Sequence, residues 1–229
     1  MKTLSEGVIR LYASGSLHLA RMTSGFEGLS LPEGFFGRAD ETDDAEFYAY
    51  PRYVAHIDDG AIDAVGALYE ELRVRGEVLD LMSSWISHFR LAPDVLTVLG
   101  MNADELAANR QARSWIVHDL NADPSVPFDD DSFDHATCCV SVDYLTRPVE
   151  VFQEVGRVVR AGGLFVCTFS NRLFPTKAIR GWLASGSATH QQIVAGYFAA
   201  AGGYEPSVTR DCATPPGSDP LYAVWATVR

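Results

Sequence analysis

The strongest constraint on the fold is an alternation of short apolar runs with amphipathic segments, which begins near residue 58. The apolar runs occupy residues 78–81, 95–100, 114–120, 135–145 and 163–170. Helical spacing of apolar residues marks the segments between some of them, at residues 59–72, 103–109 and 147–161. Short buried strands that alternate with amphipathic helices pair in parallel, so the sequence predicts a doubly wound α/β sheet.

Helix boundaries and the last strands complete this prediction. Asp58 or Asp59 can cap the first helix, and Asn102 followed by Glu105 resembles a capping box. Gly162 is expected to be the C-cap of the helix that starts near residue 147. Residues 204–210 and 220–229 have the pattern of two long strands that close the sheet edge. We therefore expect a Rossmann-like, mostly parallel sheet of seven strands.

The first part of the chain has a different character. Residues 1–57 show weak periodicity and include the acidic stretch RADETDDAEF. Long segments without regular structure are commonly functional. We expect residues 1–57 to be an N-terminal extension that acts as a cap or lid, and residues 58–229 to form the main domain.

Charge and hydropathy narrow the range of partners. The net charge of −12 disfavours nucleic acid and anionic membranes, and the nearest approach to a basic patch is Arg172, Lys177 and Arg180. No apolar run is long enough to cross a bilayer, and Glu6 and Arg10 interrupt any signal-peptide core. These features predict a cytoplasmic protein with neither nucleic acid nor membrane as its partner.

The cysteines give no sign of a metal or redox site. Cys138, Cys139, Cys167 and Cys212 lack Cys-x-x-Cys spacing, and three of them lie in apolar runs. We expect buried, reduced thiols. His56, His88 and His118 belong to separate segments without ligand-like spacing, so no metal is predicted.

In a doubly wound sheet, ligands bind beyond the carboxyl ends of the strands, at the switch in strand order. The segments that reach this edge here are residues 80–85, 100–102, 118–121, 141–144 and 170–172. They should form the functional site.

Three segments in this order resemble the class I S-adenosylmethionine-dependent methyltransferases. GEVLDL is similar to the first strand of that family, PFDDDSFD to the stretch before its fourth strand, and RVVRAGGLFV to the turn before its fifth strand. The resemblance covers roughly residues 60–170 and implies S-adenosylmethionine as cofactor. It also implies a set of cofactor-binding residues: Asp80, Met82, Ser83, Ser84, Gly100, Met101, Asn102, Asp119, Leu120 and Ser141.

Two features depart from the family pattern. Met82, Ser84 and Ile86 replace the glycines of the Gly-x-Gly-x-Gly loop, and Gly100 stands where the family has an acid that binds the ribose hydroxyls. The sequence resembles a branch that carries LDLMSSW in this loop. Serine hydroxyls can hydrogen-bond a carboxylate or the backbone, so we expect Ser83 and Ser84 to bind the methionine end of the cofactor. Asn102, just beyond Gly100, is expected to take over part of the ribose contact.

An acceptor hydroxyl or acid would need to be deprotonated before methyl transfer. The candidates for this role are His88, which follows the loop, His56 and Asp143. Asn171, Arg172 and Lys177 follow the fifth strand and are expected at the pocket rim, where they would suit an anionic acceptor.

The sequence thus favours a methyltransferase that acts on a small molecule by in-line displacement, aided by proximity and orientation. The alternative is a cofactor-binding or partner-binding domain without catalysis, supported by the missing glycines and the missing acid. A nicotinamide-dependent oxidoreductase is disfavoured because Gly-x-Gly-x-x-Gly is absent.

Overall fold

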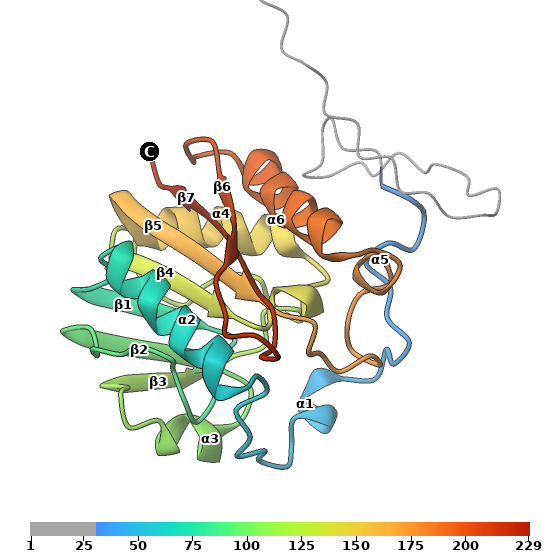
Figure 1. Ribbon diagram of the computed structural model, residues 1–229, viewed down its shortest axis with the longest axis horizontal. Helices are drawn as coiled ribbons and strands as arrows, with labels where there is room; N and C mark the ends of the chain where they lie inside the picture. The colour runs from blue at the N-terminus through green and yellow to red at the C-terminus, as the bar shows by residue number, and fades with distance from the viewer. Residues whose placement is uncertain (1–30) are drawn as a thin grey trace, which may run out of the picture.

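A computed structural model describes residues 31–229. Residues 1–30, and with them most of the predicted N-terminal extension, lie outside the described part. Seven strands form one sheet: β1 (Glu77–Leu81), β2 (Val95–Gly100), β3 (Ser114–Val117), β4 (Phe133–Cys139), β5 (Val159–Phe169), β6 (Val208–Cys212) and β7 (Leu221–Thr227). Their order is β3-β2-β1-β4-β5-β7-β6 (Figure 1).

The sheet is parallel from β3 to β5, and β7 runs antiparallel to both of its neighbours. The strand order reverses beside β1, because the chain moves outward from β1 to β2 and β3 and then returns to β4 on its other side. The carboxyl ends of β1 and β4 therefore open a crevice at this switch point. The predicted Rossmann-like, mostly parallel sheet of seven strands is confirmed.

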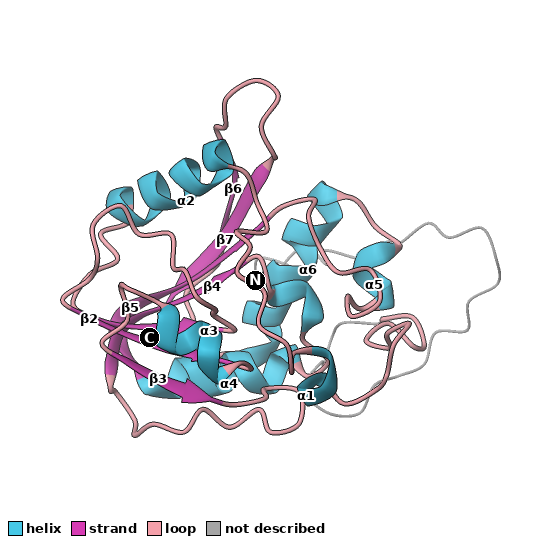
Figure 2. Ribbon diagram, turned by 90° about the horizontal axis from the view of Figure 1, so that it is seen from below, coloured by secondary structure: helices cyan, strands magenta, loops and turns pink. Residues whose placement is uncertain are grey.

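Helices cover both faces of the sheet. Helix α2 (Asp59–Glu71) packs on one face, and α4 (Pro148–Val158) and α6 (Ser187–Ala201) lie side by side on the other (Figures 1 and 2). Three helices are shorter: α1 (Asp44–Phe47), α3 (Ala103–Ala108) and α5 (Arg180–Leu183). Of these, α3 packs on β2 and β3, and its Leu106 joins the apolar cluster under α2. Residues 142–144 form a single 3-10 turn, η1. Two apolar clusters fill the two interfaces, one under α4 and α6 and one under α2.

Local sequence explains where α2 and α3 begin. The Asp58 carboxylate accepts the Ala61 N–H at 2.9 Å, as expected for an N-cap. The Asn102 side chain accepts the N–H groups of Asp104 and Glu105, so it caps α3. Both caps orient their helices on the sheet.

Two predicted boundaries were wrong. The fourth strand ends at Cys139, and residues 142–144 turn into η1 instead of continuing to Leu145. Gly162 does not cap α4, because α4 ends at Val158 and β5 begins at the next residue. The Gly162 N–H donates instead to the Val228 carbonyl, near the C-terminus. Gly162 has a φ of +87°, in the left-handed region.

No helix within residues 31–229 is long and apolar enough to span a membrane.

Candidate functional site

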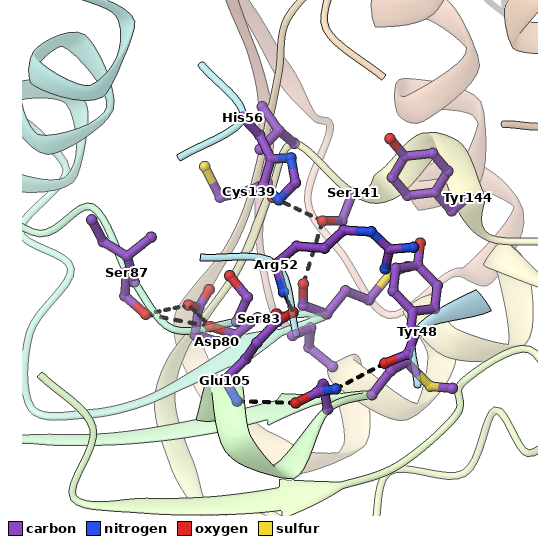
Figure 3. A pocket seen from close by; sticks show the side chains of 18 of the residues that line it. Tyr48, Arg52, His56, Asp80, Ser83, Ser87, Glu105, Cys139, Ser141 and Tyr144 are labelled. Carbon is purple, nitrogen blue, oxygen red and sulfur yellow. Dashed lines mark hydrogen bonds between the residues drawn. The ribbon is translucent and has the colours of Figure 1, made fainter. Parts of the chain in front are cut away.

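A cavity of about 290 Å3 lies beyond the carboxyl ends of β1 to β4 (Figure 3). Its floor is formed by the residues that follow these strands, and residues 44–56 and 172–174 line its other side. This volume is at the lower end of the range for small-molecule sites. The lining includes these sequence-predicted residues: His56, Asp80, Met82, Ser83, Ser84, His88, Gly100, Met101, Asn102, Asp119, Leu120 and Ser141.

Asp80 organises the loop that follows β1. Its Oδ2 accepts the hydroxyls of Ser83 at 2.7 Å and Ser87 at 2.6 Å, and its Oδ1 accepts the Thr137 hydroxyl at 2.7 Å. Burial raises the pKa of this carboxyl, while the three hydroxyl donors lower it. Asp80 therefore holds the loop to the sheet through its side chain.

The hydroxyls of the loop serines form hydrogen bonds mainly with other groups of the protein. The Ser83 hydroxyl donates to Asp80, which differs from the expected role of binding the methionine end of the cofactor. Asn109 donates to the Ser87 hydroxyl and to the Ser84 carbonyl, both at 3.0 Å. Among residues 31–229 the Ser84 hydroxyl has no hydrogen bond, so Ser84 is the loop serine that remains free for a ligand.

Met82 has the backbone conformation that a glycine usually supplies. Its φ is +52°, in the left-handed region. The Met82 carbonyl accepts the Ser141 hydroxyl at 3.3 Å, which joins the loop to the end of β4. The turn thus keeps a positive φ at the first glycine position of the family motif, although the glycine is absent.

Gly100 at the end of β2 lies directly against the loop. The Ser83 N–H donates to the Leu99 carbonyl at 2.8 Å, and a Cβ placed on Gly100 would lie 2.2 Å from the Ser83 carbonyl oxygen. A side chain at this position would therefore collide with the loop backbone. The two departures from the family pattern fit each other sterically.

Asn102 is committed to structural contacts. Its amide oxygen caps α3, and its amide nitrogen donates to the carbonyls of Tyr48 at 2.9 Å and Ala49 at 3.2 Å. These four hydrogen bonds use both donors and the amide oxygen. In this structure the Asn102 side chain therefore fastens the segment around Tyr48 to α3, and the expected ribose contact would require it to give up one of these bonds.

Asp119 follows β3 and closes a turn. Its Oδ1 accepts the N–H groups of Asn121 at 2.8 Å and Ala122 at 3.2 Å. Its Oδ2 has no hydrogen bond within the described part of the chain, and Asp119 lines the cavity beside the buried Leu120. One carboxylate oxygen thus remains for a ligand, while the other fixes the turn.

Aromatic rings surround the Arg52 guanidinium on the side opposite the loop. Its Cζ lies 4.5 Å from the ring centre of Phe47, 5.6 Å from that of Phe174 and 5.7 Å from that of Tyr48. Its Nη2 donates to the Phe47 carbonyl at 2.8 Å. Cation–π contacts therefore hold this charge at the cavity wall.

Two histidines line the cavity in neutral form. His88 is 8% exposed, and burial together with the nearby His56 lowers its pKa to about 4. Its buried Nδ1 has no partner among the described residues. Desolvation and the Arg52 charge also lower the pKa of His56, whose ring lies edge-on to Phe174. Both imidazoles are therefore available as proton acceptors near neutral pH.

Asp143 does not line the cavity. It is 3% exposed, and burial raises its pKa to about 8. A carboxyl group in that environment is largely protonated near neutral pH, so it is no base. The structure therefore corrects the expectation that Asp143 activates the acceptor: η1 carries it into the interior instead of into the cavity.

The prediction that basic residues lie at the pocket rim is wrong for one of them. Lys177 is 0% exposed, and its Nζ lies 3.0 Å from the Asp44 carboxylate, which Arg38 also binds at 2.7 Å. Arg172 pairs with Asp219, and Arg180 donates to the Arg38 carbonyl. Lys177 is buried because residues 38–44, far away in the sequence, supply its partners. Arg172 does line the cavity.

Several residues at or near the cavity were not singled out as site residues from the sequence. Ser87 and Asn109 complete the Asp80 network, and Glu105 was noted only for its capping position. Tyr48 and Tyr144 bring phenol rings to the lining. Proximity to the strand ends could have identified Ser87, but Tyr48 reaches the cavity, and Asn109 reaches the loop behind it, through contacts between distant segments.

No group of three or more histidine, cysteine, aspartate or glutamate side chains within residues 31–229 is arranged to hold a metal ion. Four free cysteines are present, of which Cys138 and Cys167 are buried. Burial raises the pKa of both of these thiols.

Comparisons with known proteins agree with this geometry. Residues 80–167 match the family model described as a methyltransferase domain. No curated protein matches the chain. With the strand order described above, this match shows that residues 80–167 are similar to a methyltransferase domain and lie in a Rossmann-like fold. S-adenosylmethionine is the cofactor that this similarity indicates.

Solved structures share the fold at low sequence identity. A protein from Pyrococcus horikoshii has a TM-score of 0.54 at 16% identity, covering 80% of this chain and 99% of that one. A SAM-dependent methyltransferase from Aquifex aeolicus has a TM-score of 0.54 at 13% identity, covering 74% and 92%. A SAM-dependent methyltransferase from Thermotoga maritima has a TM-score of 0.53 at 11% identity, covering 74% and 91%.

Proposed function

We propose that this chain binds S-adenosylmethionine in the cavity beyond β1 to β4 and transfers its methyl group to a small-molecule acceptor. The observation that carries the proposal is the intact geometry of the β1 loop. Met82 keeps a positive φ, Asp80 holds three hydroxyls, and Gly100 leaves room for the Ser83 carbonyl. These contacts hold the loop in an ordered turn at the edge of the cavity, where a ligand can meet it.

The lining suits the chemical parts of the cofactor. Met101 and the buried Leu120 offer apolar surface for the purine, and Asp119 has a free carboxylate oxygen beside them. Residues 82–84 and Ser141 meet at the ends of β1 and β4, where polar contacts for the amino-acid end are available. The bound cofactor would supply a sulfonium methyl group that is activated for nucleophilic attack.

The remaining wall suits a small acceptor. Arg52, His56 and Tyr144 line the cavity on the side away from the loop, and residues 44–56 cover it. A covered cavity of about 290 Å3 favours a small molecule over a macromolecular surface. Excluding water there would also strengthen the electrostatic contacts that orient the acceptor.

The residues of this chain would contribute mainly position and proton acceptance. Orientation of two reactants can lower a barrier by about 7–11 kcal/mol, so methyl transfer needs little further help. His88 and His56 are neutral and would take the proton of an acceptor hydroxyl or acid. His88 is the stronger candidate by position, because it follows the cofactor loop directly.

Ligand binding tests the first part of the proposal. We expect S-adenosylmethionine and S-adenosylhomocysteine to raise the melting temperature saturably, and NAD to have no effect. Asp80→Ala should abolish this response, because three buried hydroxyls lose their acceptor. Asp80→Asn keeps one acceptor oxygen and should weaken binding less. Asp94→Ala is the matched control, because Asp94 is exposed and outside the cavity.

No response to either sulfur nucleotide at millimolar concentration would contradict the proposal. Formation of S-adenosylhomocysteine with a panel of hydroxyl, amine and carboxylic acid acceptors tests the transfer step. Binding without turnover on the whole panel would favour a cofactor-binding domain that does not catalyse. Turnover only with protein or RNA would contradict the small-molecule acceptor.

A further inference from the structure

The last residue of β2 has no side chain that could hydrogen-bond the hydroxyl groups of a nucleoside. Gly100 occupies this position, and its Cα faces the Ser83 carbonyl so closely that a Cβ would lie 2.2 Å from that oxygen. Such an approach excludes every residue except glycine unless the loop moves. A group that binds ribose hydroxyls must therefore come from another position.

Asn102, the next polar residue along the chain, does not fill the gap. Its side chain is used by two hydrogen bonds that cap α3 and two that hold the carbonyls of Tyr48 and Ala49. Releasing it would leave the first turn of α3 without its cap.

Glu105 is the carboxylate that the structure brings to this part of the cavity. It lies in the first turn of α3, is 8% exposed and lines the cavity. Figure 3 shows its side chain extending from α3 toward Arg52 and Ser83. An acidic side chain thus lines the cavity from the helix that follows β2, although none stands at the end of that strand.

One oxygen of this carboxylate is occupied and the other is free. Oε1 accepts the backbone N–H of Arg52 at 2.5 Å. Oε2 has no hydrogen-bond partner among residues 31–229 and is not sealed off from the cavity. Glu105 forms no ion pair with any described residue, and the Arg52 guanidinium is turned toward the aromatic rings. This carboxylate oxygen at the cavity surface has no donor from the described part of the protein and can accept a hydrogen bond from a ligand or water.

We propose that Glu105 binds the ribose hydroxyls of the nucleoside cofactor, in place of the acid that is missing after β2. The inference rests on the proposed function, because it assumes that the nucleoside occupies this cavity. A vicinal diol offers two O–H donors, and hydrogen bonds to a carboxylate are stronger than those to a neutral acceptor. The same carboxylate would then join the bound ribose to residues 48–56 through the Arg52 N–H.

Titration calorimetry with two ligands tests the assignment. The probes are S-adenosylhomocysteine and its 2′,3′-dideoxy analogue, with the full chain as wild type, Glu105→Gln and Asp104→Asn. Wild type should bind the dideoxy analogue at least about thirtyfold more weakly, because a hydrogen bond to a charged group is lost. Glu105→Gln keeps an acceptor for the Arg52 N–H but loses the carboxylate, so the preference should shrink to about fivefold or less.

Asp104→Asn is the matched control, because Asp104 is exposed and lies on the same first turn of α3. It removes the same charge from the helix terminus and should leave the preference unchanged. Thermal unfolding checks that each variant is folded. If Glu105→Gln does not fold, Glu105→Asp keeps the charge with a shorter reach and should reduce the preference.

The outcomes separate the two proposals. If Glu105→Gln weakens both ligands by the same factor, Glu105 only positions residues 48–56, and the ribose assignment is overturned. An unchanged preference overturns it as well. If wild type binds neither ligand, the proposed function fails and this assignment fails with it.

Discussion

Ser83 and Gly100 are packed backbone against backbone, with the Ser83 carbonyl oxygen 2.2 Å from the place where a Cβ of residue 100 would lie. The neighbouring Ser83 N–H donates to the Leu99 carbonyl at 2.8 Å, so the loop is hydrogen-bonded to the end of β2. The unusual loop and the missing strand-end acid are therefore one structural feature. Restoring the acid alone would not restore the usual site.

This relationship predicts the effect of Gly100→Asp. We expect the variant to lose about 1–3 kcal/mol of unfolding free energy, the usual cost of overpacking, and to bind S-adenosylhomocysteine more weakly than wild type. Urea denaturation and calorimetry measure the two effects. Gly186→Ala is the control, since nothing lies within 4 Å of a Cβ there and φ is −110°. A Gly100→Asp variant that binds more tightly than wild type would contradict this steric account.

The backbone of Met82 gives a second prediction. Its φ of +52° is costly for any residue with a Cβ, by about 1–2 kcal/mol. Met82→Gly and Met82→Ala both remove the long side chain, so their difference reports the backbone alone. Met82→Gly should be more stable than Met82→Ala by about 1 kcal/mol in urea denaturation. The opposite order would show that the turn relaxes to a negative φ.

The sequence predicted the parts of the molecule that depend on local periodicity. The strands near β1, β2 and β5 and helix α2 follow from apolar spacing, and the mostly parallel pairing follows from the alternation of strands and helices. Helix α6 was not predicted. Gly162 was misjudged because its N–H partner, the Val228 carbonyl, lies at the other end of the chain. Local patterns do not reveal such partners.

The candidate site also has one aspect that the sequence predicted and one that it did not. Its location at the ends of β1 to β4 was predictable, because topology fixes where parallel strands end. The contacts that each side chain makes within the site were not predictable from the sequence. Ser83 was expected to face the ligand but donates to Asp80, and Lys177 was expected at the rim but is buried beside Asp44. The partner of Lys177 is a carboxylate that only the fold brings into contact, whereas Asp80 is three residues from Ser83 and accepts its hydroxyl because the loop turns back on the strand end.

Asp143 should make the protein less stable as the pH rises. Its folded pKa of about 8 lies above the value of 3.8 for an unperturbed side chain, so the native state binds the proton more tightly. Stability from this group is present below the unfolded pKa and is lost as pH rises toward 8, at no more than about 1.4 kcal/mol per pH unit.

Asp143→Asn removes this titration and should flatten that slope. Urea denaturation of wild type and Asp143→Asn across the neutral range measures the difference. We expect the variant to gain stability relative to wild type as pH increases. A constant difference would show that the Asp143 carboxyl does not titrate in this range.

His88 should have the opposite pH dependence. Its folded pKa of about 4 lies below the unperturbed value of 6.5, so the unfolded chain binds the proton more tightly. The stability contributed by neutral His88 is present above the unfolded pKa and is lost as pH falls through this window, by at most about 1.4 kcal/mol per pH unit. His88→Gln removes the titration, and its unfolding free energy should fall less on acidification than that of wild type. The same imidazole can be followed by NMR, where we expect it to stay neutral down to about pH 5. An imidazole that titrates near its unperturbed pKa would show that water reaches the His88 ring.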